Sequence, residues 1–267
     1  MGPLSTMPDS RTFIFGIFLS HLMSGTLYVV STPIGNLEDM SFRAIRILKE
    51  VSIIAAEDTR RTQKLCAYYQ IGTPLTSYHD FNKEEKSAIL LQRLQEGSSV
   101  ALVCDAGTPL VSDPGYYLVN RTVNAKIPLV PIPGPSSILT ALCISGLATD
   151  RFIFEGFVPR KPGAREKFFE KLQPEVGTII VFETQHRIIK TLRAIFKIMG
   201  NRQIVLTREL TKLNEEIMRG DVEEICQILE EKTIKGEITL LIQGQPQRKS
   251  KQNSFADSHP ITNRPFQ

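Results

Sequence analysis

Residues 99–115 read SVALVCDAGTPLVSDPG, and this stretch decides the fold. Its first part, residues 100–104, is a short apolar run typical of a strand buried inside a parallel sheet. The loop that follows carries two aspartates, Asp105 and Asp113, with two glycines and two prolines. Ligands of open α/β sheets bind at the carboxyl ends of the strands. We therefore interpret the loop as a binding site rather than an ordinary turn, and expect Asp113 to cap a helix that has Pro114 in its first turn.

Apolar runs and amphipathic segments alternate on both sides of this stretch. Further strands are expected at residues 27–31, 51–56 and 129–132, with a shorter one near Leu75, and Ser41 and Asn82 are expected to cap two of the helices between them. This alternation predicts a parallel sheet with helices on its faces. Polar turns follow four of the strands, and right-handed crossovers would place all four turns on one edge of the sheet. These turns are residues 32–36, 57–60, 105–115 and 133–137.

A second unit of the chain begins near residue 151. Strands are expected at residues 152–157, 178–182, 204–207 and 237–243, with an antiparallel one at 215–219, which makes this sheet mixed. Asp221 and Glu224 form a capping pattern ahead of a helix at 222–233, and the charged residues 165–171 are interpreted as a solvated helix face.

The fold class is therefore α/β, with two α/β domains. The predicted boundaries are an N-terminal extension at 1–25, domains at 26–147 and 151–244, and a disordered basic tail at 245–267.

Composition and cysteine spacing give no sign of a disulfide-rich, zinc-binding or membrane-spanning protein. With 42% hydrophobic and 22% charged residues the chain is ordinary for a soluble globular protein, and a net charge of +4 favours an anionic partner only weakly. The four cysteines are widely spaced and form no C-x-x-C pair, which indicates free thiols in a reducing compartment such as the cytoplasm. No His/Cys spacing suggests a zinc site. The apolar run at residues 13–19 is too short to span a bilayer, and we interpret the residues ahead of Met23 as an extension rather than a targeting signal.

Familiar catalytic motifs are absent from the sequence. No G-x-G-x-x-G follows a predicted strand, and the glycine loop of the commonest methyltransferase fold is missing. There is also no Walker loop, no G-x-S-x-G elbow and no zincin motif. Several large enzyme classes are therefore excluded, and the residues that indicate a function lie in the predicted loops.

Those loops carry short motifs in a fixed order. They are STPIGNL at 31–37, EDTR at 57–60, DAGTP at 105–109, SDPG at 112–115, PGPS at 133–136, GFVPRK at 156–161, RELTK at 208–212 and GE at 236–237. Over about residues 26–244 this set resembles the tetrapyrrole methylase family, and within it the enzymes that methylate RNA of the small ribosomal subunit. The resemblance implies S-adenosylmethionine as cofactor, held in the cleft between two α/β domains, and 2′-O-methylation of a cytidine in the decoding region of 16S rRNA. It also implies a homodimer that uses neither a metal nor a membrane.

The sequence departs from the family pattern in three places. Cys104 stands where the family usually has serine, and Thr184 and Gln185 stand where it has serine and proline. The chain also lacks the helical C-terminal extension of longer relatives, so we expect the basic tail to take over part of any grip on RNA.

Carried over by motif, the resemblance places cofactor contacts in both domains. They are Pro33, Asp105, Ala106, Gly107, Thr108, Pro135 and Ser136 in the first, and Phe182, Glu183, Leu206, Glu237 and Ile238 in the second. A base must remove the proton of the ribose hydroxyl, and the candidates are Asp58, Glu57, Asp105 and His186. Cations in or beside the motif loops are candidates for contacts with RNA phosphates. They are Arg60, Arg61, Arg160, Lys161, Arg187, Arg208 and Lys212.

Simpler interpretations stay open beside these. Asp58 could cap a helix and pair with Arg60, and His186 could be a surface residue at a helix start. For the whole protein, the alternatives are methylation of a small tetrapyrrole-like substrate and a non-catalytic rRNA-binding role.

Overall fold

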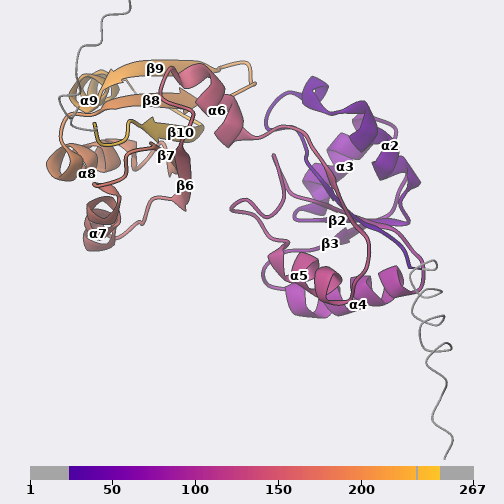
Figure 1. Cartoon of the computed structure of the whole chain (residues 1–267). Helices are drawn as coiled ribbons and strands as arrows, with labels where there is room; N and C mark the ends of the chain where they lie inside the picture. The colour runs from indigo at the N-terminus through magenta and orange to yellow at the C-terminus, as the bar shows by residue number, and fades with distance from the viewer. Residues whose placement is uncertain (1–23, 233, 247–267) are drawn as a thin grey trace, which may run out of the picture.

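Two five-stranded sheets, each built from one part of the chain, organise the computed structural model, which describes residues 24–232 and 234–246 (Figure 1). The expectations for the N-terminal extension and for most of the basic tail concern residues outside these ranges. The predicted α/β class is confirmed, because both sheets carry helices on their faces.

The first sheet is parallel throughout. Its strands are β1 (Leu27–Val30), β2 (Ile53–Ala56), β3 (Leu75–Ser77), β4 (Val100–Val103) and β5 (Leu129–Ile132), in the order β3-β2-β4-β1-β5. Every neighbouring pair is parallel, so all five carboxyl ends lie on one edge. All four residues of β4 are buried, which explains its continuous apolar sequence.

Helices cover both faces of this sheet. Helices α2 (Phe42–Glu50) and α3 (Thr59–Tyr68) lie on one face, where Ile47 and Leu65 pack in one cluster with Ile54 and Val103. Helices α4 (Lys83–Gln95) and α5 (Tyr116–Asn124) supply the second cluster, which includes Leu102 of the same central strand.

The second sheet is mixed, as predicted. Its strands are β6 (Phe152–Phe157), β7 (Thr178–Thr184), β8 (Gln203–Arg208), β9 (Glu216–Asp221) and β10 (Glu237–Ile242), in the order β6-β7-β10-β8-β9. Strands β6 and β7 are parallel and the other pairs are antiparallel. Helices α7 (Pro162–Leu172), α8 (Ile188–Met199) and α9 (Val222–Glu231) pack on one face (Figure 1).

Helix α6 (Ser137–Ser145) links the two sheets. It follows β5 of the first sheet, yet Ala141 and Leu142 pack with Ile180, Val205 and Leu241 of the second. Figure 1 shows α6 beside β8 and β10, on the side of the second sheet away from α7 and α8. One hydrophobic cluster therefore joins α6, which follows the first sheet in the sequence, to the second sheet.

Three local expectations were wrong. Asp113 does not cap a helix: α5 begins after Gly115, whose φ of 140° suits glycine and turns the chain before the helix starts. Asn82 stands at the N-cap position of α4 but its side chain makes no capping bond, because its oxygen accepts the His79 N–H at 2.9 Å instead. Arg165 is buried rather than solvated, since it shares a helix face with Phe169, four residues later, that packs on the sheet.

Candidate active site

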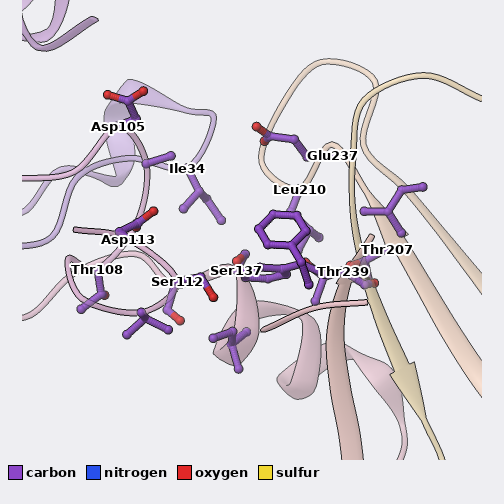
Figure 2. Close-up of a pocket in the computed structure, with 18 of the residues that line it drawn as sticks. Ile34, Asp105, Thr108, Ser112, Asp113, Ser137, Thr207, Leu210, Glu237 and Thr239 are labelled. Carbon is purple, nitrogen blue, oxygen red and sulfur yellow. Dashed lines mark hydrogen bonds between the residues drawn. The ribbon is translucent and has the colours of Figure 1, made fainter. Parts of the chain in front are cut away.

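A cleft of about 430 Å³ lies between the two sheets and is lined by residues from both. One wall is formed by the loops after β1, β2 and β4 and by the start of α6, and the other by the ends of β7 and β10 and the loop after β8. Figure 2 shows Asp105, Thr108 and Asp113 on one side, with Glu237 and Thr239 on the other. The volume suits a small organic molecule of cofactor size.

Hydrogen bonds join the loops that follow β1, β4 and β5. The N–H of Thr32 donates to the carbonyl of Gly107 at 2.8 Å, and the Gly107 N–H donates back at 3.0 Å. The hydroxyls of Ser31 and Thr108 lie 2.9 Å apart, and the Thr108 hydroxyl donates to the carbonyl of Pro135 at 3.2 Å. Because these strands are neighbours in the sheet, the sequence motifs that follow them form one continuous wall.

The loop after β2 is attached to the same wall through Asp105. The Oδ1 atom of Asp105 accepts the Asp58 N–H at 3.0 Å, and its Oδ2 atom pairs with Arg61 at 3.3 Å. In return, the Asp105 N–H donates to Oε2 of Glu57 at 3.3 Å. Both carboxylate oxygens of Asp105 are thus used to hold the loops together.

Asp58 and His186, two of the predicted bases, do not line the cleft. The Asp58 side chain accepts the Arg60 N–H at the start of α3 and pairs with the Arg60 guanidinium at 2.7 Å. The hydrogen bonds from Arg60 hold the pKa of Asp58 well below its usual range, which makes it a poor proton acceptor. His186 is exposed, and its ring contacts the neighbouring Gln185 amide at 3.1 Å. These contacts are those of the simpler interpretations, a helix cap and a surface residue.

Glu57, by contrast, lines the cleft with a pKa raised above the usual value. Burial is the largest cause of the shift, and the charges of Asp105 and Asp113 add to it. Asp113 lines the cleft as well, and its pKa is also raised, chiefly by burial and further by Asp105. Buried like charges of this kind are common at sites of proton transfer.

The second wall holds a buried ion pair at the end of β7. Glu183, whose side chain is fully buried, pairs with Arg187 at 2.6 Å and also accepts bonds from the Thr184 N–H and the Thr191 hydroxyl. Arg187 donates further to the carbonyl of Val158 at 2.9 Å. Glu183 therefore lies beside the cleft with its carboxylate committed to the fold.

The loops after β1 and β8 contact each other next to Ile34 and Leu210, which line the cleft. The N–H of Asn36, after β1, donates to the hydroxyl of Thr211, after β8, at 3.1 Å. Gly35 lies so close that a Cβ atom there would be 2.6 Å from the Thr211 hydroxyl and 2.9 Å from the Leu210 carbonyl. Only glycine allows the two loops to approach this far.

Most of the predicted cofactor contacts are brought together in this cleft, and three are not. Those among the lining residues are Asp105, Ala106, Gly107, Thr108, Ser136, Phe182, Glu183, Glu237 and Ile238. Pro33, Pro135 and Leu206 lie outside the lining. Leu206 is fully buried within β8, and Pro135 contributes its carbonyl to Thr108.

The predicted RNA contacts separate into two groups. Arg208 and Lys212 are engaged within the fold, as is Arg187: Arg208 pairs with Glu216 at 3.0 Å, and Lys212 with Glu237 at 3.0 Å. Their positions in the motif loops gave no sign of these partners, which come from other strands.

The remaining cations are more accessible. Arg60 and Arg61 pair with acidic groups but keep 87% and 65% of their side chains exposed. Arg160 and Lys161 are exposed and form no ion pair with any residue in 24–232 or 234–246. They follow β6, whose last residue Phe157 lines the cleft.

Several residues that line the cleft were not among the predicted cofactor contacts, although some lie in the quoted motifs. They include Ile34, Ser112, Asp113, Phe157, Thr207, Leu210 and Thr239. Thr239 pairs with both Thr207 and Phe182 in the sheet register, so a correct pairing of β7, β10 and β8 could have found it. Asp113 was noted as an acceptor within the opening stretch but was expected to cap a helix.

The described part of the chain contains no group of three or more His, Cys, Asp or Glu side chains arranged to hold a metal ion. None of its helices is long and apolar enough to cross a membrane.

Several solved structures share this fold. Diphthine synthase superposes with a TM-score of 0.62 at 16% identity, over 82% of this chain and 90% of that one. The uroporphyrin-III C-methyltransferase of Thermus thermophilus, in complex with S-adenosyl homocysteine, superposes with a TM-score of 0.58 at 19% identity, over 81% and 97% of the two chains. At these identities the likeness establishes the fold.

Relatives at higher identity carry one name. Ribosomal RNA small subunit methyltransferase I of Halalkalibacterium halodurans is 50% identical over 82% of this chain and 76% of its own length. The enzyme of the same name from Haemophilus influenzae is 45% identical over 84% of this chain and 80% of its own. The family model described as tetrapyrrole (corrin/porphyrin) methylases matches residues 26–226. Fold, cleft and sequence agree that the chain belongs to the tetrapyrrole methylase family.

Proposed function

We propose that this protein is an S-adenosylmethionine-dependent methyltransferase that 2′-O-methylates a cytidine in the decoding region of 16S rRNA. The observation that carries the proposal is the cleft itself, in which the motif loops of the first sheet face the ends of β7 and β10. The names of relatives 45–50% identical to this chain support the rRNA substrate. We also propose, from the resemblance alone, that the enzyme works as a homodimer in the cytoplasm.

The residues of the cleft fit the proposed cofactor. When bound, S-adenosylmethionine supplies a methyl group on a sulfonium, which is a good leaving group. Ile34, Phe182 and Leu210 offer apolar contacts for its adenosine, and the loop at Gly107 offers backbone groups. Gly107 has a φ of +88°, which other side chains rarely adopt, and because it carries no side chain its backbone can approach a ligand closely.

The chain's own contribution to the reaction is mainly positional. A ribose hydroxyl held in line with the methyl group reacts far faster than one that is free to rotate, because the orientation has been fixed beforehand. The hydrogen-bonded wall formed by the loops after β1, β4 and β5 gives the rigid frame that such alignment needs.

The two alternatives have less support. A small carboxylate-rich tetrapyrrole would also suit cations, but the exposed Arg160 and Lys161 extend the positive surface beyond the cleft, which suits a long polyanion better. A non-catalytic RNA-binding role would not require a cleft of cofactor size between two domains.

Transfer of a tritiated methyl group from S-adenosylmethionine to unmethylated small ribosomal subunits tests the proposal directly. The expected product is 2′-O-methylcytidine in the decoding region, located by mass mapping of the digested RNA. Cofactor binding without transfer to RNA would point to the small-molecule acceptor. The absence of both binding and transfer would leave only the non-catalytic alternative.

A further inference from the structure

Five acidic residues line the cleft, and they differ in what their carboxylates do. Glu183 and Asp105 are fully engaged with donors inside the fold, as described above. Glu237 pairs with Lys212 in the loop after β8, and Glu57 accepts the backbone N–H of Asp105. Asp113 alone of these five has no ion pair and accepts no hydrogen bond from a nitrogen or hydroxyl group within residues 24–232 and 234–246.

Asp113 is directed at the open space. Figure 2 shows its carboxylate turned towards Ile34, on the side of the loop that faces the opposite wall. A half-buried carboxylate that receives no hydrogen bond from a nitrogen or hydroxyl group is costly for the fold unless a ligand or water uses it.

The loop holds Asp113 in this position by an unusual backbone path. Leu110 and Ser112 have φ values of 75° and 66°, in the left-handed region that side chains other than glycine rarely adopt. Gly115, directly after the SDP segment, packs so closely on Leu102 that a Cβ atom would be 2.9 Å from it. Strain of this kind is kept where surrounding structure fixes a functional geometry.

The charged and titratable groups around Asp113 are few. The Cys104 thiol, directly after β4, is its side-chain hydrogen-bond partner, and Asp105, Glu57 and Arg61 share its wall. Across the cleft, Glu237 is the carboxylate of the opposite wall that retains the most exposure, at 77% of its side chain. Burial and the Asp105 charge raise the pKa of Asp113, so it is a stronger proton acceptor than an ordinary aspartate.

We propose that Asp113 is the catalytic base that accepts the proton of the ribose 2′-hydroxyl. The inference rests on the proposed function. In the step, a bond forms between the 2′-oxygen and the methyl carbon while the carbon–sulfur bond breaks, and its electron pair goes to sulfur. The hydroxyl proton passes to the Asp113 carboxylate, which later releases it to water. Glu57 is then a positioning residue, since its Oε2 atom holds the Asp105 N–H.

The test compares Asp113→Asn with the wild-type enzyme in single-turnover methyl transfer to unmethylated small subunits. Asparagine keeps the shape of the side chain and cannot accept the proton, so we expect the rate to fall by about 100-fold or more. Asp113→Glu should recover part of it. Asp150→Asn, at an exposed position outside the cleft lining, is the matched control and should keep the wild-type rate.

Two further readouts separate a base from a structural role. Calorimetry should give the same affinity for S-adenosylmethionine in Asp113→Asn and wild type. In carbon-13 NMR of the ligand-free protein, one aspartate carboxyl should titrate above the usual range and should be missing in Asp113→Asn. The wild-type rate should fall as the pH is lowered through that titration, because a protonated carboxyl accepts no proton, whereas the rate of the variant should stay flat.

The outcomes are distinct. No transfer by the wild type would contradict the proposed function. Normal transfer by the wild type with an unchanged rate in Asp113→Asn would overturn the assignment of the base. A lower rate in Asp113→Asn that still falls as the pH is lowered would overturn it too. If Glu57→Gln instead has a lower rate that no longer depends on pH, the base is Glu57.

Discussion

The Glu183–Arg187 pair shows how strongly a single residue's role depends on its partners. Both were expected to face ligands, Glu183 the cofactor and Arg187 the RNA. In the structure, the fully buried Glu183 carboxylate is neutralised by Arg187, whose side chain is 18% exposed. Removing the arginine would leave a buried charge without a partner, which costs far more than losing a surface pair.

We therefore expect Arg187→Met to lower the free energy of unfolding by about 3 kcal/mol, measured by urea denaturation. Arg193→Met is the matched control. Arg193 pairs with Glu230 on the surface, where 66% and 46% of the two side chains are exposed, so that change should stay near or below about 0.5 kcal/mol. Equal effects of the two substitutions would contradict the structural role given to Arg187.

For single residues, the sequence predicted which polar loops would come together but not which of their side-chain atoms would lack a partner within the protein. The loops at 57–60 and 105–115 do meet, as parallel strand order required. That Asp105 would be occupied by Asp58 and Arg61 depends on contacts across more than forty residues of chain, which local patterns do not encode. Asp113 was overlooked as a base because an aspartate before proline is also a common helix cap.

Among the elements, α2 is the helix whose start follows most directly from its sequence. The Ser41 hydroxyl accepts the Ala44 N–H at 3.1 Å, and Ala44, Ile47 and Leu48 form the buried face. The cap satisfies a backbone donor that would otherwise have no partner within the helix.

Replacing Ser41 by alanine should lower the free energy of unfolding by about 1 kcal/mol, because that donor loses its acceptor. Ser52→Ala provides the comparison, since Ser52 is exposed after α2 and its backbone bond to Ser99 does not involve the side chain. The Ser52 change should stay within about 0.5 kcal/mol. Thermal unfolding followed by circular dichroism suffices for both.

Element boundaries were predictable where a cap or a glycine marks them and less so elsewhere. Asp221 caps α9 by accepting the Glu224 N–H at 2.9 Å, and the Glu224 position gave the clue in advance. Helix α5 began later than expected because Gly115, rather than Asp113, turns the chain. Strand β7 runs two residues beyond its predicted end, because pairing with β10 continues through Thr184.

For the whole molecule, RNA binding should depend on the exposed cations that follow β6. If Arg160 and Lys161 contact phosphates, replacing both by alanine should reduce the slope of log affinity against log salt by about 0.7 per cation, as for single-stranded RNA. Filter binding of small-subunit rRNA over a salt series measures this. Lys167→Ala with Lys171→Ala, two exposed lysines on α7, is the charge-matched control. An unchanged slope in the first variant would remove these residues from the interface.

The contact between the loops after β1 and β8 can be tested at Gly35. A side chain there would push the loop after β8 away and break the bond from Asn36 to Thr211. Gly35→Ala should therefore weaken S-adenosylmethionine binding by about tenfold, the equivalent of one lost hydrogen bond. Gly72→Ala is the control, because nothing lies within 4 Å of the position of its Cβ atom. Calorimetry with both variants decides whether the contact between these loops matters for cofactor binding.

Helix α6 makes the order of the chain differ from the order in space. It is encoded in the first half, but its apolar face completes the core of the second sheet, and Arg219 of β9 donates to the carbonyl of Ser145 at its end. Split into two genes at the link after Gly146, the protein would become an obligate pair of polypeptides, each incomplete without the other. For the same reason, recombination that exchanged the second half between relatives would succeed only when α6 travelled with it.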